Sequence, residues 1–444
     1  MNSAYPPAFQ SRLLAKHLTR QRIFHRIPRY VVEYLLAKFA PTGDPAAVER
    51  VQRLLQDHYL TIDQREYVKD QLLRTGRFVL IDELRVTVDL QQREHSAHLQ
   101  SLGKIRVNVP FDLPARSPAV LHGSWGTITL AYDSARGQAQ VTDFQPFQVS
   151  APRLDEFVEA RRAMTEDRWL TLLLRSVGLE PQSMPRRLRL LYLLRLAPLV
   201  EGNLNLMELG PRQTGKTFLL RNTSPDAFVI SGGKATPAAL LYNQATRTPG
   251  VIPTHKAVLF DEIAHTSWTD PALLSSLKDY MESGQFSRGD QTFQADASLI
   301  FMGNADHAQQ PLHAALPRAL ARDTAFLDRL HGLIPGFEFP KLTDQHLTSE
   351  FGLVTDYLAE IFSALRGEPT QPLLPHLFPA DLTTRDRRSI EKLTSALLKL
   401  LYPAGDCPEA VMVELQRLAT ELRQRVQHEL HLLNPLEFPK VNSG

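Results

Sequence analysis

The sequence contains a single cysteine, Cys407, among 444 residues. One thiol excludes an internal disulfide and any zinc site made of several cysteines. No run of 18 apolar residues occurs, so we expect no transmembrane helix and no membrane partner. The N-terminus also lacks an apolar segment that ends in small residues, which is the pattern of a secretory signal. These absences together predict a cytoplasmic protein.

Net charge is small as well, at +2, so the balance over the whole chain indicates no class of partner. Acidic residues are nevertheless absent before Glu33, while basic residues accumulate there. A basic block of this kind suits contact with the phosphate backbone of DNA, although a solvated helix face has the same composition. The candidate DNA-binding residues of the block are Arg20, Arg22, Arg26 and Arg29, and Arg12 and Lys16 precede them.

The stretch LNLMELGPRQTGKTF at 204–218 carries the most specific chemistry in the chain. A short apolar run ends at Gly210, and the residues that follow match the phosphate-binding pattern G-x-x-x-x-G-K-[ST]. Glycines let successive backbone N–H groups point into one concave nest that binds phosphate oxygens. Lys216 is expected to reach the outer phosphates, and Thr217 to offer its hydroxyl to Mg²⁺. The predicted ATP-binding residues are Gly210, Pro211, Arg212, Gln213, Thr214, Gly215, Lys216, Thr217 and Phe218.

A second nucleotide motif follows at 257–262, where an apolar strand-like run ends in Asp261 and Glu262. A carboxylate at the end of a buried strand can hold the Mg²⁺ shell, and the next one can polarise the attacking water. The alternative is a strand whose exposed end carries two solvated acids. Together with the upstream loop, the motif predicts Asp261 as a metal ligand and Glu262 as the residue that activates water, with ATP and Mg²⁺ as cofactors.

Apolar periodicity and turn residues divide the chain into regions. Helical spacing predicts helices over 30–39, 46–59 and 64–74. Four or five strands without helices between them then predict a small β-barrel, either of the oligonucleotide-binding type or a module for oligomer contacts. Further on, strand candidates at 204–209, 227–230, 257–261 and 297–302 alternate with helices, which is typical of a P-loop α/β layer. The predicted regions are an N-terminal helical region at 1–76, the β-rich module at 77–150, a helical linker at 151–202, the α/β ATPase core at 203–340 and a C-terminal helical lid at 341–435.

Three further polar residues are candidates for the catalytic machinery. Asn304 follows a strand candidate, where an amide can orient the attacking water; a turn-forming asparagine is the alternative. Arg329 precedes another short apolar segment, and an arginine so placed commonly reaches the γ-phosphate held by a neighbouring subunit. An ion pair with Asp328 on the surface is the alternative for it. Arg385 opens a helix in the last region and is a candidate lid arginine, for which Arg388 competes.

The stretch 282–297 has two glycine turns and a strand-like Gln-Thr-Phe segment, which predicts a β-hairpin inserted in the ATPase layer. Arg288 and Gly289 form its tip and suit contact with a polyanion that passes through a ring. A loop for subunit contacts is the alternative. Phe286 and Phe293 flank the tip and keep open a protein-remodelling function, for which an aromatic pore loop is expected.

Longer strings establish a more specific resemblance. The segments MELGPRQTGKTFLL, VISGGKATPAALLYNQATRTPG, VLFDEIA, LKDYMESGQFSRG and LIFMGN resemble the ATPase of the Lon-like BrxL family of BREX phage-defence systems. The likeness extends to YVVEYLLAKF and WLTLLLRSVGLEP before this region and to FLDRLHGLIPGFEFPK and LLKLLYPAG after it. It therefore covers nearly the whole chain.

The BrxL family belongs to the AAA+ ATPases and is similar in layout to the MCM replicative helicases. The resemblance implies an AAA+ core, a DNA-binding N-terminal part and a hexameric motor with a hairpin in its pore. The implied partners are double-stranded DNA, further copies of the chain in a single or stacked double hexamer, and other BREX components. Longer members carry a Lon-type protease domain with a Ser–Lys dyad after the ATPase. The sequence ends soon after its last predicted helix, so we expect a short form without protease activity.

We therefore predict a ring-forming ATPase that couples ATP binding or hydrolysis to DNA engagement. The predicted catalytic residues are Glu262, Asn304, Arg329 and Arg385, the metal ligands are Thr217 and Asp261, and Arg288 joins the N-terminal arginines as a DNA contact. An ATP-gated DNA clamp that recruits other defence proteins is the first rival function, and a protein remodeller is the second.

Overall fold

In a computed structural model, the chain forms two compact units, one made of 1–16 and 153–444 and the other of 17–152. The described residues are 5–103, 105–121, 123–147, 153–268, 270–305, 307 and 312–440. Each unit has its own hydrophobic core. The two units are larger than the five predicted regions and do not test the boundaries between them. The division into five regions therefore remains a prediction.

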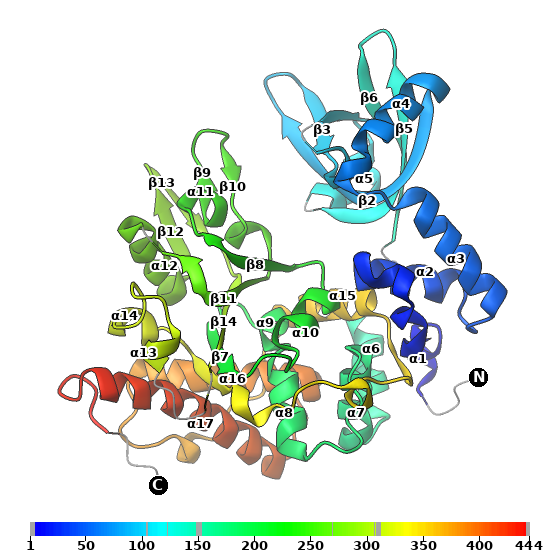
Figure 1. Cartoon of the computed structure of the whole chain (residues 1–444). Helices are drawn as coiled ribbons and strands as arrows, with labels where there is room; N and C mark the ends of the chain where they lie inside the picture. Colours follow the sequence, from blue (N-terminus) through cyan, green and yellow to red (C-terminus); the bar gives the residue numbers. More distant parts are fainter. Residues whose placement is uncertain are drawn as a thin grey trace. The chain divides into compact units, whose positions relative to one another are not determined.

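The smaller unit, 17–152, begins with helices and continues into a barrel (Figure 1). Its longer helices are α2 (Arg29–Phe39), α3 (Pro45–His58) and α4 (Arg65–Thr75), and the short α5 (Leu113–Arg116) follows later. The three long helices agree with the expected ones to within one residue at each end. Gly76 ends α4 with a φ of 70°, the left-handed conformation that glycine adopts most easily after a helix.

The barrel consists of β2 (Arg77–Asp89), β3 (Glu94–His98), β4 (Arg106–Val109), β5 (Ser124–Asp133) and β6 (Gln138–Pro146). Hydrogen bonds join the strands in the closed order β2-β3-β4-β6-β5. Because successive side chains along a strand point to opposite faces, one apolar set fills the interior. That set includes Leu80, Leu84, Val86, Ala97, Val107, Ile128, Leu130 and Val141. The expectation of a small five-stranded barrel is confirmed.

The larger unit is built around a five-stranded sheet in the order β15-β7-β14-β11-β8 (Figure 1). The strands are β7 (Leu206–Gly210), β8 (Ala227–Lys234), β11 (Ala257–Ser267), β14 (Ser298–Asn304) and β15 (Gly332–Pro335). All neighbouring pairs are parallel. The carboxyl ends of the strands therefore meet at one edge, which is where ligands bind in open α/β sheets.

The four strand candidates are confirmed, but β8 and β11 run further than predicted. They continue to Lys234 and Ser267, with a break in register after Asp261. The extension of β8 could not be predicted, because it contains Gly232 and Gly233 and glycine is a poor strand former.

Helices surround this sheet. α10 (Lys216–Thr223) follows β7, and α12 (Pro271–Ser283) follows β11. The long helices α16 (Thr384–Leu401) and α17 (Glu409–Leu433) pack together, and α17 also contacts β15 (Figure 1). The remaining helices of the unit are α1 (Pro7–Gln10), α6 (Leu154–Arg162), α7 (Glu166–Ser176), α8 (Arg186–Leu194), α9 (Ala197–Val200), α11 (Pro237–Leu240), α13 (Leu312–Ala315), α14 (Thr324–Leu327) and α15 (Thr355–Arg366). Within the described ranges, no helix has the length and apolar character needed to cross a bilayer.

Three small antiparallel pairs complete the unit. β1 (Leu13–Ala15) pairs with β16 (Phe351–Leu353), which is why the first sixteen residues belong here and not to the barrel unit. The other two pairs are hairpins in the same unit. One is β9 (Tyr242–Asn243) with β10 (Thr248–Pro249), and the other is β12 (Gln285–Arg288) with β13 (Gln291–Gln294).

Candidate functional site

The loop between β7 and α10 turns sharply and leads into the first turn of the helix. Gln213 and Gly215 have positive φ angles of 68° and 75°. A side chain at Gly210 would lie 2.5 Å from the backbone of Gly336, so no other residue fits there without a shift of the chain. Backbone N–H groups at such a helix start attract anions, because they have no partner within the helix.

A cavity of 420 Å³ lies beside this loop at the carboxyl edge of the sheet. It is lined by Arg212, Gln213, Thr214, Gly215, Lys216, Thr217, Phe218, Asp261, Glu262 and Asn304. Residues 212–218 follow β7, whereas Asp261 and Glu262 lie within β11 and Asn304 ends β14, and the parallel topology brings these three strands together. Of the residues predicted to bind ATP, only Gly210 and Pro211 are missing from the lining. The carbonyl oxygens of both accept hydrogen bonds from Lys216.

The ammonium group of Lys216 is held by three oxygen acceptors. Nζ donates to the carbonyl oxygen of Gly210 at 2.9 Å, to that of Pro211 at 2.7 Å and to Asn304 Oδ1 at 3.2 Å. Burial lowers the pKa of Lys216, and the nearby carboxylate of Glu208 opposes this effect. All three acceptors are neutral, so a phosphate oxygen in the cavity would be a stronger partner for the same donors.

Thr217 and Asp261 place two side-chain oxygens next to each other at the edge of the cavity. Thr217 Oγ1 donates to Asp261 Oδ2 at 2.8 Å, and Asp261 Oδ1 accepts from the backbone N–H of Glu262 at 3.0 Å. Mg²⁺ prefers hard oxygen ligands and usually combines one or two carboxylates with phosphate oxygens and water. No group of three or more His, Cys, Asp or Glu suited to a metal occurs in the described part of the chain. The Thr217–Asp261 pair therefore fits Mg²⁺ bound together with phosphate.

Glu262 lies at a strained point of β11. Its φ is 53°, which is uncommon for a residue other than glycine, and the register with β8 breaks here. Such strain typically costs about 1–3 kcal/mol and clusters at functional sites. The Glu262 side chain is 54% exposed and lies 4.0 Å from His265. Its carboxylate can therefore accept a hydrogen bond from water in the cavity.

A buried ion pair between Arg195 and Glu208 is hydrogen-bonded to the phosphate loop. Arg195, the residue directly after α8, donates from Nε and Nη2 to both carboxylate oxygens of Glu208 in β7, at 2.9 and 2.6 Å. Its Nη1 donates to the carbonyl oxygen of Thr214 at 2.9 Å, and its guanidinium lies 3.6 Å from the ring centre of Phe339. Both charged side chains are completely buried. Sequence reasoning missed this pair, for which the only signal is a charge inside each of two apolar runs.

The structure does not bring Arg329 or Arg385 to the cavity. Both lie beside the last turn of α12, where Arg385 Nη2 is 2.7 Å and Arg329 Nε is 3.6 Å from the carboxylate of Glu282. Asp328 pairs with Arg385 and Arg423, so the alternative of a surface pair between Asp328 and Arg329 is not seen in the described residues. Of the two competing lid arginines, it is Arg385 that joins Arg329, whereas Arg388 is exposed on α16.

Arg423 of α17 fixes the backbone on both sides of Arg329. Its Nη1 donates to the carbonyl oxygens of Asp328 at 2.9 Å and Leu330 at 2.5 Å. Its Nε and Nη2 bind the carboxylates of Asp386 and Asp328 at 2.7 and 2.6 Å. Arg423 is 1% exposed. α17 therefore sets the position of Arg329, which no sequence motif indicated.

Two hairpins pack against each other in the larger unit (Figure 1). The β12–β13 hairpin with Arg288 near its turn is confirmed, whereas no sequence pattern indicated β9–β10. The rings of Tyr242 and Phe293 join them with centres 4.6 Å apart, and Phe286 stacks on Phe293 at 5.2 Å. The turn of β9–β10 carries Arg247, which is exposed and has a φ of 54°.

The two phenylalanines of the hairpin face the interior of this pair. Phe286 is 2% exposed, and Phe293 is partly buried between Phe286 and Tyr242. They hold the hairpins together, which argues against the aromatic pore loop of a protein remodeller. Arg288 is half-buried, and its Nε has no hydrogen-bond acceptor among the described residues. Arg247 and Arg288 are thus the cations that the two hairpins carry at or near their turns.

The N-terminal basic block is divided between the two units, with Arg12 and Lys16 in the larger unit and the later arginines in the barrel unit. Lys16 is buried in the larger unit and donates to the carbonyl oxygen of Leu353 at 2.7 Å. Arg12 of the same unit lies 4.2 Å from the ring centre of Tyr357 and 3.7 Å from Glu156. Both cations are therefore engaged inside their own unit.

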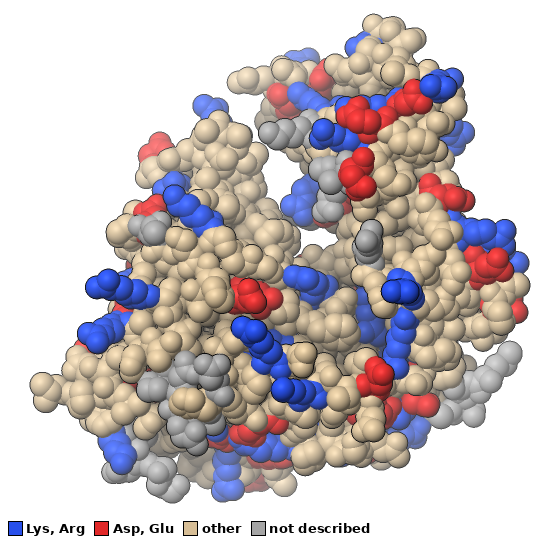
Figure 2. Space-filling view, in the orientation of Figure 1, with Lys and Arg blue, Asp and Glu red and all other residues tan. Residues whose placement is uncertain are grey.

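In the barrel unit, the candidate DNA-binding arginines differ from one another. Arg20 and Arg22 are exposed, whereas Arg29 forms an ion pair with Glu33 at 2.7 Å. The side chain of Arg26 lies outside the described part of the structure. On the face shown in Figure 2, basic and acidic side chains are interspersed. The assignment of these arginines as DNA contacts therefore remains a prediction.

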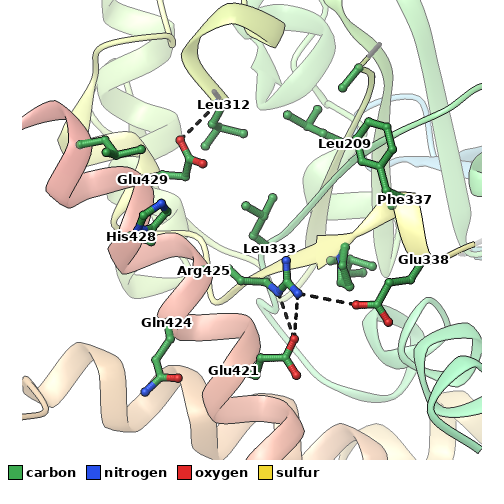
Figure 3. Close-up of a pocket in the computed structure, with 15 residues that line it drawn as sticks. Leu209, Leu312, Leu333, Phe337, Glu338, Glu421, Gln424, Arg425, His428 and Glu429 are labelled. Carbon is green, nitrogen blue, oxygen red and sulfur yellow. Dashed lines mark hydrogen bonds and ion pairs between the residues drawn. The ribbon is translucent and has the colours of Figure 1, made fainter. Parts of the chain in front are cut away.

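A larger cavity of 640 Å³ lies between α17 and the chain after β15 (Figure 3). Its charged groups are paired with one another: Arg425 with Glu421 at 2.9 Å and with Glu338 at 3.6 Å, while Glu429 accepts from the backbone of Leu312. It shares no lining residue with the smaller cavity. The residues predicted to bind nucleotide line the smaller cavity and not this one.

Comparison with known proteins agrees with this geometry. Residues 139–444 match a family model described as "Lon-like protease BrxL-like, ATPase domain", and residues 7–132 match "BREX system Lon protease-like protein BrxL N-terminal". The chain is 35% identical to the Lon-like protease BrxL of Escherichia coli O9:H4 (strain HS) over 98% of its length, and spans 65% of that protein. It is 33% identical over 98% of its length to the Lon-like protease BrxL of Bacillus cereus (strain H3081.97), of which it spans 67%.

Proposed function

The chain belongs to the BrxL family, and we propose that it is a ring-forming AAA+ ATPase that couples ATP hydrolysis to the engagement of double-stranded DNA in phage defence. The observation that carries the proposal is the cavity in which Lys216, the Thr217–Asp261 pair, Glu262 and Asn304 converge. The relatives are named proteases, but the models that match this chain are an N-terminal and an ATPase domain. We therefore propose ATPase activity for it.

In this function, each group in the cavity has a defined task. Backbone N–H groups of the loop and Lys216 would hold the phosphates, and Thr217 and Asp261 would hold Mg²⁺, whose charge would offset that of the phosphate oxygens when it is bound. Glu262 orients the attacking water and takes up its proton. Asn304, which already binds Lys216, fixes the side of the cavity where that water enters.

Arg329 and Arg385 act on the nucleotide of a neighbouring copy. Their distance from their own cavity supports this, together with their common location beside Glu282. An arginine supplied by a second subunit stabilises the charge that develops on the γ-phosphate. The function therefore requires a closed ring, which we propose is a hexamer, single or stacked in pairs.

DNA is contacted by the paired hairpins and by the barrel unit. Arg247 and Arg288 provide cations near the turns of the hairpins, and Arg20 and Arg22 provide exposed cations in the other unit. None of these four lies on a helix of the kind that reads bases in a groove, so we propose binding to the phosphate backbone without sequence preference. Small five-stranded barrels include nucleic-acid-binding modules, which suits a role of the barrel in the same contact. Other BREX components are further proposed partners.

The decisive experiment measures ATP hydrolysis and displacement of a streptavidin block from biotinylated duplex DNA. We expect duplex to stimulate hydrolysis and the protein to displace the block, both of which Lys216→Ala abolishes. Lys234→Ala, at an exposed lysine of the same sheet, serves as the matched control and keeps both activities. Hydrolysis with DNA binding but no displacement would favour the clamp, and no hydrolysis under any condition would refute the proposal.

A further inference from the structure

Glu282 is shared by the two arginines that lie outside the cavity. The same carboxylate oxygen, Oε2, is 2.7 Å from Arg385 Nη2 and 3.6 Å from Arg329 Nε. The side chains of Glu282 and Arg385 are 35% exposed, and that of Arg329 is 19% exposed. One half-exposed carboxylate therefore faces two guanidinium groups.

These guanidinium groups have donors left over. Arg329 Nη1 donates to the carbonyl oxygen of Ala325 at 2.7 Å, and Arg385 Nη1 binds Asp328. The Nε atoms of Arg329 and Arg385 are both buried and have no hydrogen-bond acceptor among the described residues. Buried donors without acceptors are unfavourable. A terminal phosphate group has three non-bridging oxygens and therefore offers the two guanidinium groups more acceptors than a single carboxylate does.

We propose that Glu282 is the resting partner of Arg329 and Arg385 and occupies the place that a phosphate of the neighbouring subunit takes during turnover. This inference rests on the proposed function, in which the two arginines act on the next subunit. While Glu282 holds them, the arginines are partly neutralised and turned toward α12. ATP hydrolysis then requires them to exchange one anion for another.

Hydrogen bonds fix the backbone around Arg329, whereas Glu282 is free of such bonds to Arg423 and can change its position. Arg423 binds the carbonyl oxygens on both sides of Arg329, and it is itself held by Asp386, which caps the start of α16. Glu282, by contrast, lies in the last turn of α12, just before Gly284 ends that helix at a φ of 74°. The carboxylate, and not the arginine backbone, is thus the adjustable member of the cluster.

Glu282 is also directly connected to the hairpin that we propose contacts DNA. β12 begins at Gln285, and the backbone N–H of Ala295 donates to the carbonyl oxygen of Gly284 at 2.9 Å, which closes the base of the hairpin. Tyr280, two residues before Glu282 in α12, packs on Phe286 of β12. A shift of the hairpin on DNA therefore moves the end of α12 and with it Glu282. The connection makes release of the arginines responsive to DNA.

The test is the variant Glu282→Gln, which keeps the size of the side chain but removes its charge. We expect ATP hydrolysis without DNA to rise about two- to fivefold, the range expected for loss of one half-exposed ion pair. Stimulation by duplex should fall toward onefold, while KM for ATP stays unchanged because the cavity is untouched. Glu282→Ala should change both rates in the same direction, so the result does not depend on one substitution.

Asp279→Asn is the matched control, because it removes one charge from an exposed position of the same helix. It should leave basal and stimulated rates at parental values. Parental rates in Glu282→Gln, or a loss of activity as large as that of Arg329→Ala, would overturn the inference. The proposed function fails separately: if assembled rings of Arg329→Ala and Arg385→Ala both hydrolyse ATP at the parental rate, the arginines do not act in trans, whatever Glu282 does.

Discussion

Replacement of Arg195 by methionine tests whether the phosphate loop depends on the ion pair beneath it. The substitution leaves Glu208 as a charged group with no exposed surface and removes the donor from the carbonyl oxygen of Thr214. Removing one partner of a buried pair typically destabilises by about 3–5 kcal/mol. At about 2 °C per kcal/mol for a large domain, the unfolding transition of the larger unit should fall by about 6–10 °C.

Nucleotide affinity should fall as well, for a separate reason. A hydrogen bond from a charged donor contributes about 1.5–3 kcal/mol, and removal of the bond to Thr214 frees the loop at the point where it turns into α10. Each 1.4 kcal/mol is tenfold in the dissociation constant, so we expect ATP to bind about 10- to 100-fold more weakly.

The double variant Arg195→Met/Glu208→Leu separates the two effects. Replacing a whole buried ion pair by apolar residues of similar size is often neutral, so most of the decrease in melting temperature should be reversed. ATP affinity should stay low, because Thr214 still lacks its donor. Thermal unfolding and isothermal titration with an ATP analogue measure the two quantities. Full recovery of affinity in the double variant, or parental affinity in Arg195→Met, would refute the role assigned to this hydrogen bond.

Three further changes probe the proposed cavity, the ring and the DNA contact. Glu262→Gln should keep ATP affinity and lower turnover at least a hundredfold, since only the water-orienting carboxylate is removed; a parental rate would contradict its role. Arg329→Ala should bind ATP but hydrolyse little, and mixing it with Lys216→Ala protein should restore part of the activity, because some interfaces then join an intact loop to an intact arginine; no recovery despite confirmed subunit exchange would argue against a shared site. Arg247→Ala and Arg288→Ala should each reduce the slope of log affinity for duplex against log salt by about one for every phosphate that the arginine neutralises, and unchanged slopes would place the DNA surface elsewhere.

Residues that contact the nucleotide cavity were largely predictable, and the reason is topological. Each follows a short apolar strand, and parallel strands align their carboxyl ends at one edge of a sheet. Lys216, Asp261 and Asn304 could therefore be expected near one another from sequence alone. The side-chain contacts, such as that of Lys216 Nζ with Asn304 Oδ1, agree with this expectation.

The features that sequence analysis did not predict depend on contacts between elements that the spacing of residues in the sequence does not indicate. The β9–β10 hairpin has strands of only two residues, too short for any alternation to be visible. The N-terminal basic block looked uniform because its residues are neighbours along the chain, yet the boundary between the two units runs through it. Proximity in sequence is therefore a weak guide to a charged surface.

Residue types and short-range periodicity were enough to specify the local chemistry of this protein: a glycine-bearing loop, carboxylates at strand ends, a hairpin and a barrel. Which charges pair depended instead on packing. The contacts of Arg195 with Glu208, of Arg423 with Asp328 and of Glu282 with two arginines join separate helices, strands and loops. The physical reason is that a charge taken out of water needs a partner of opposite sign, and packing, not the order of residues along the chain, determines which partner is within reach.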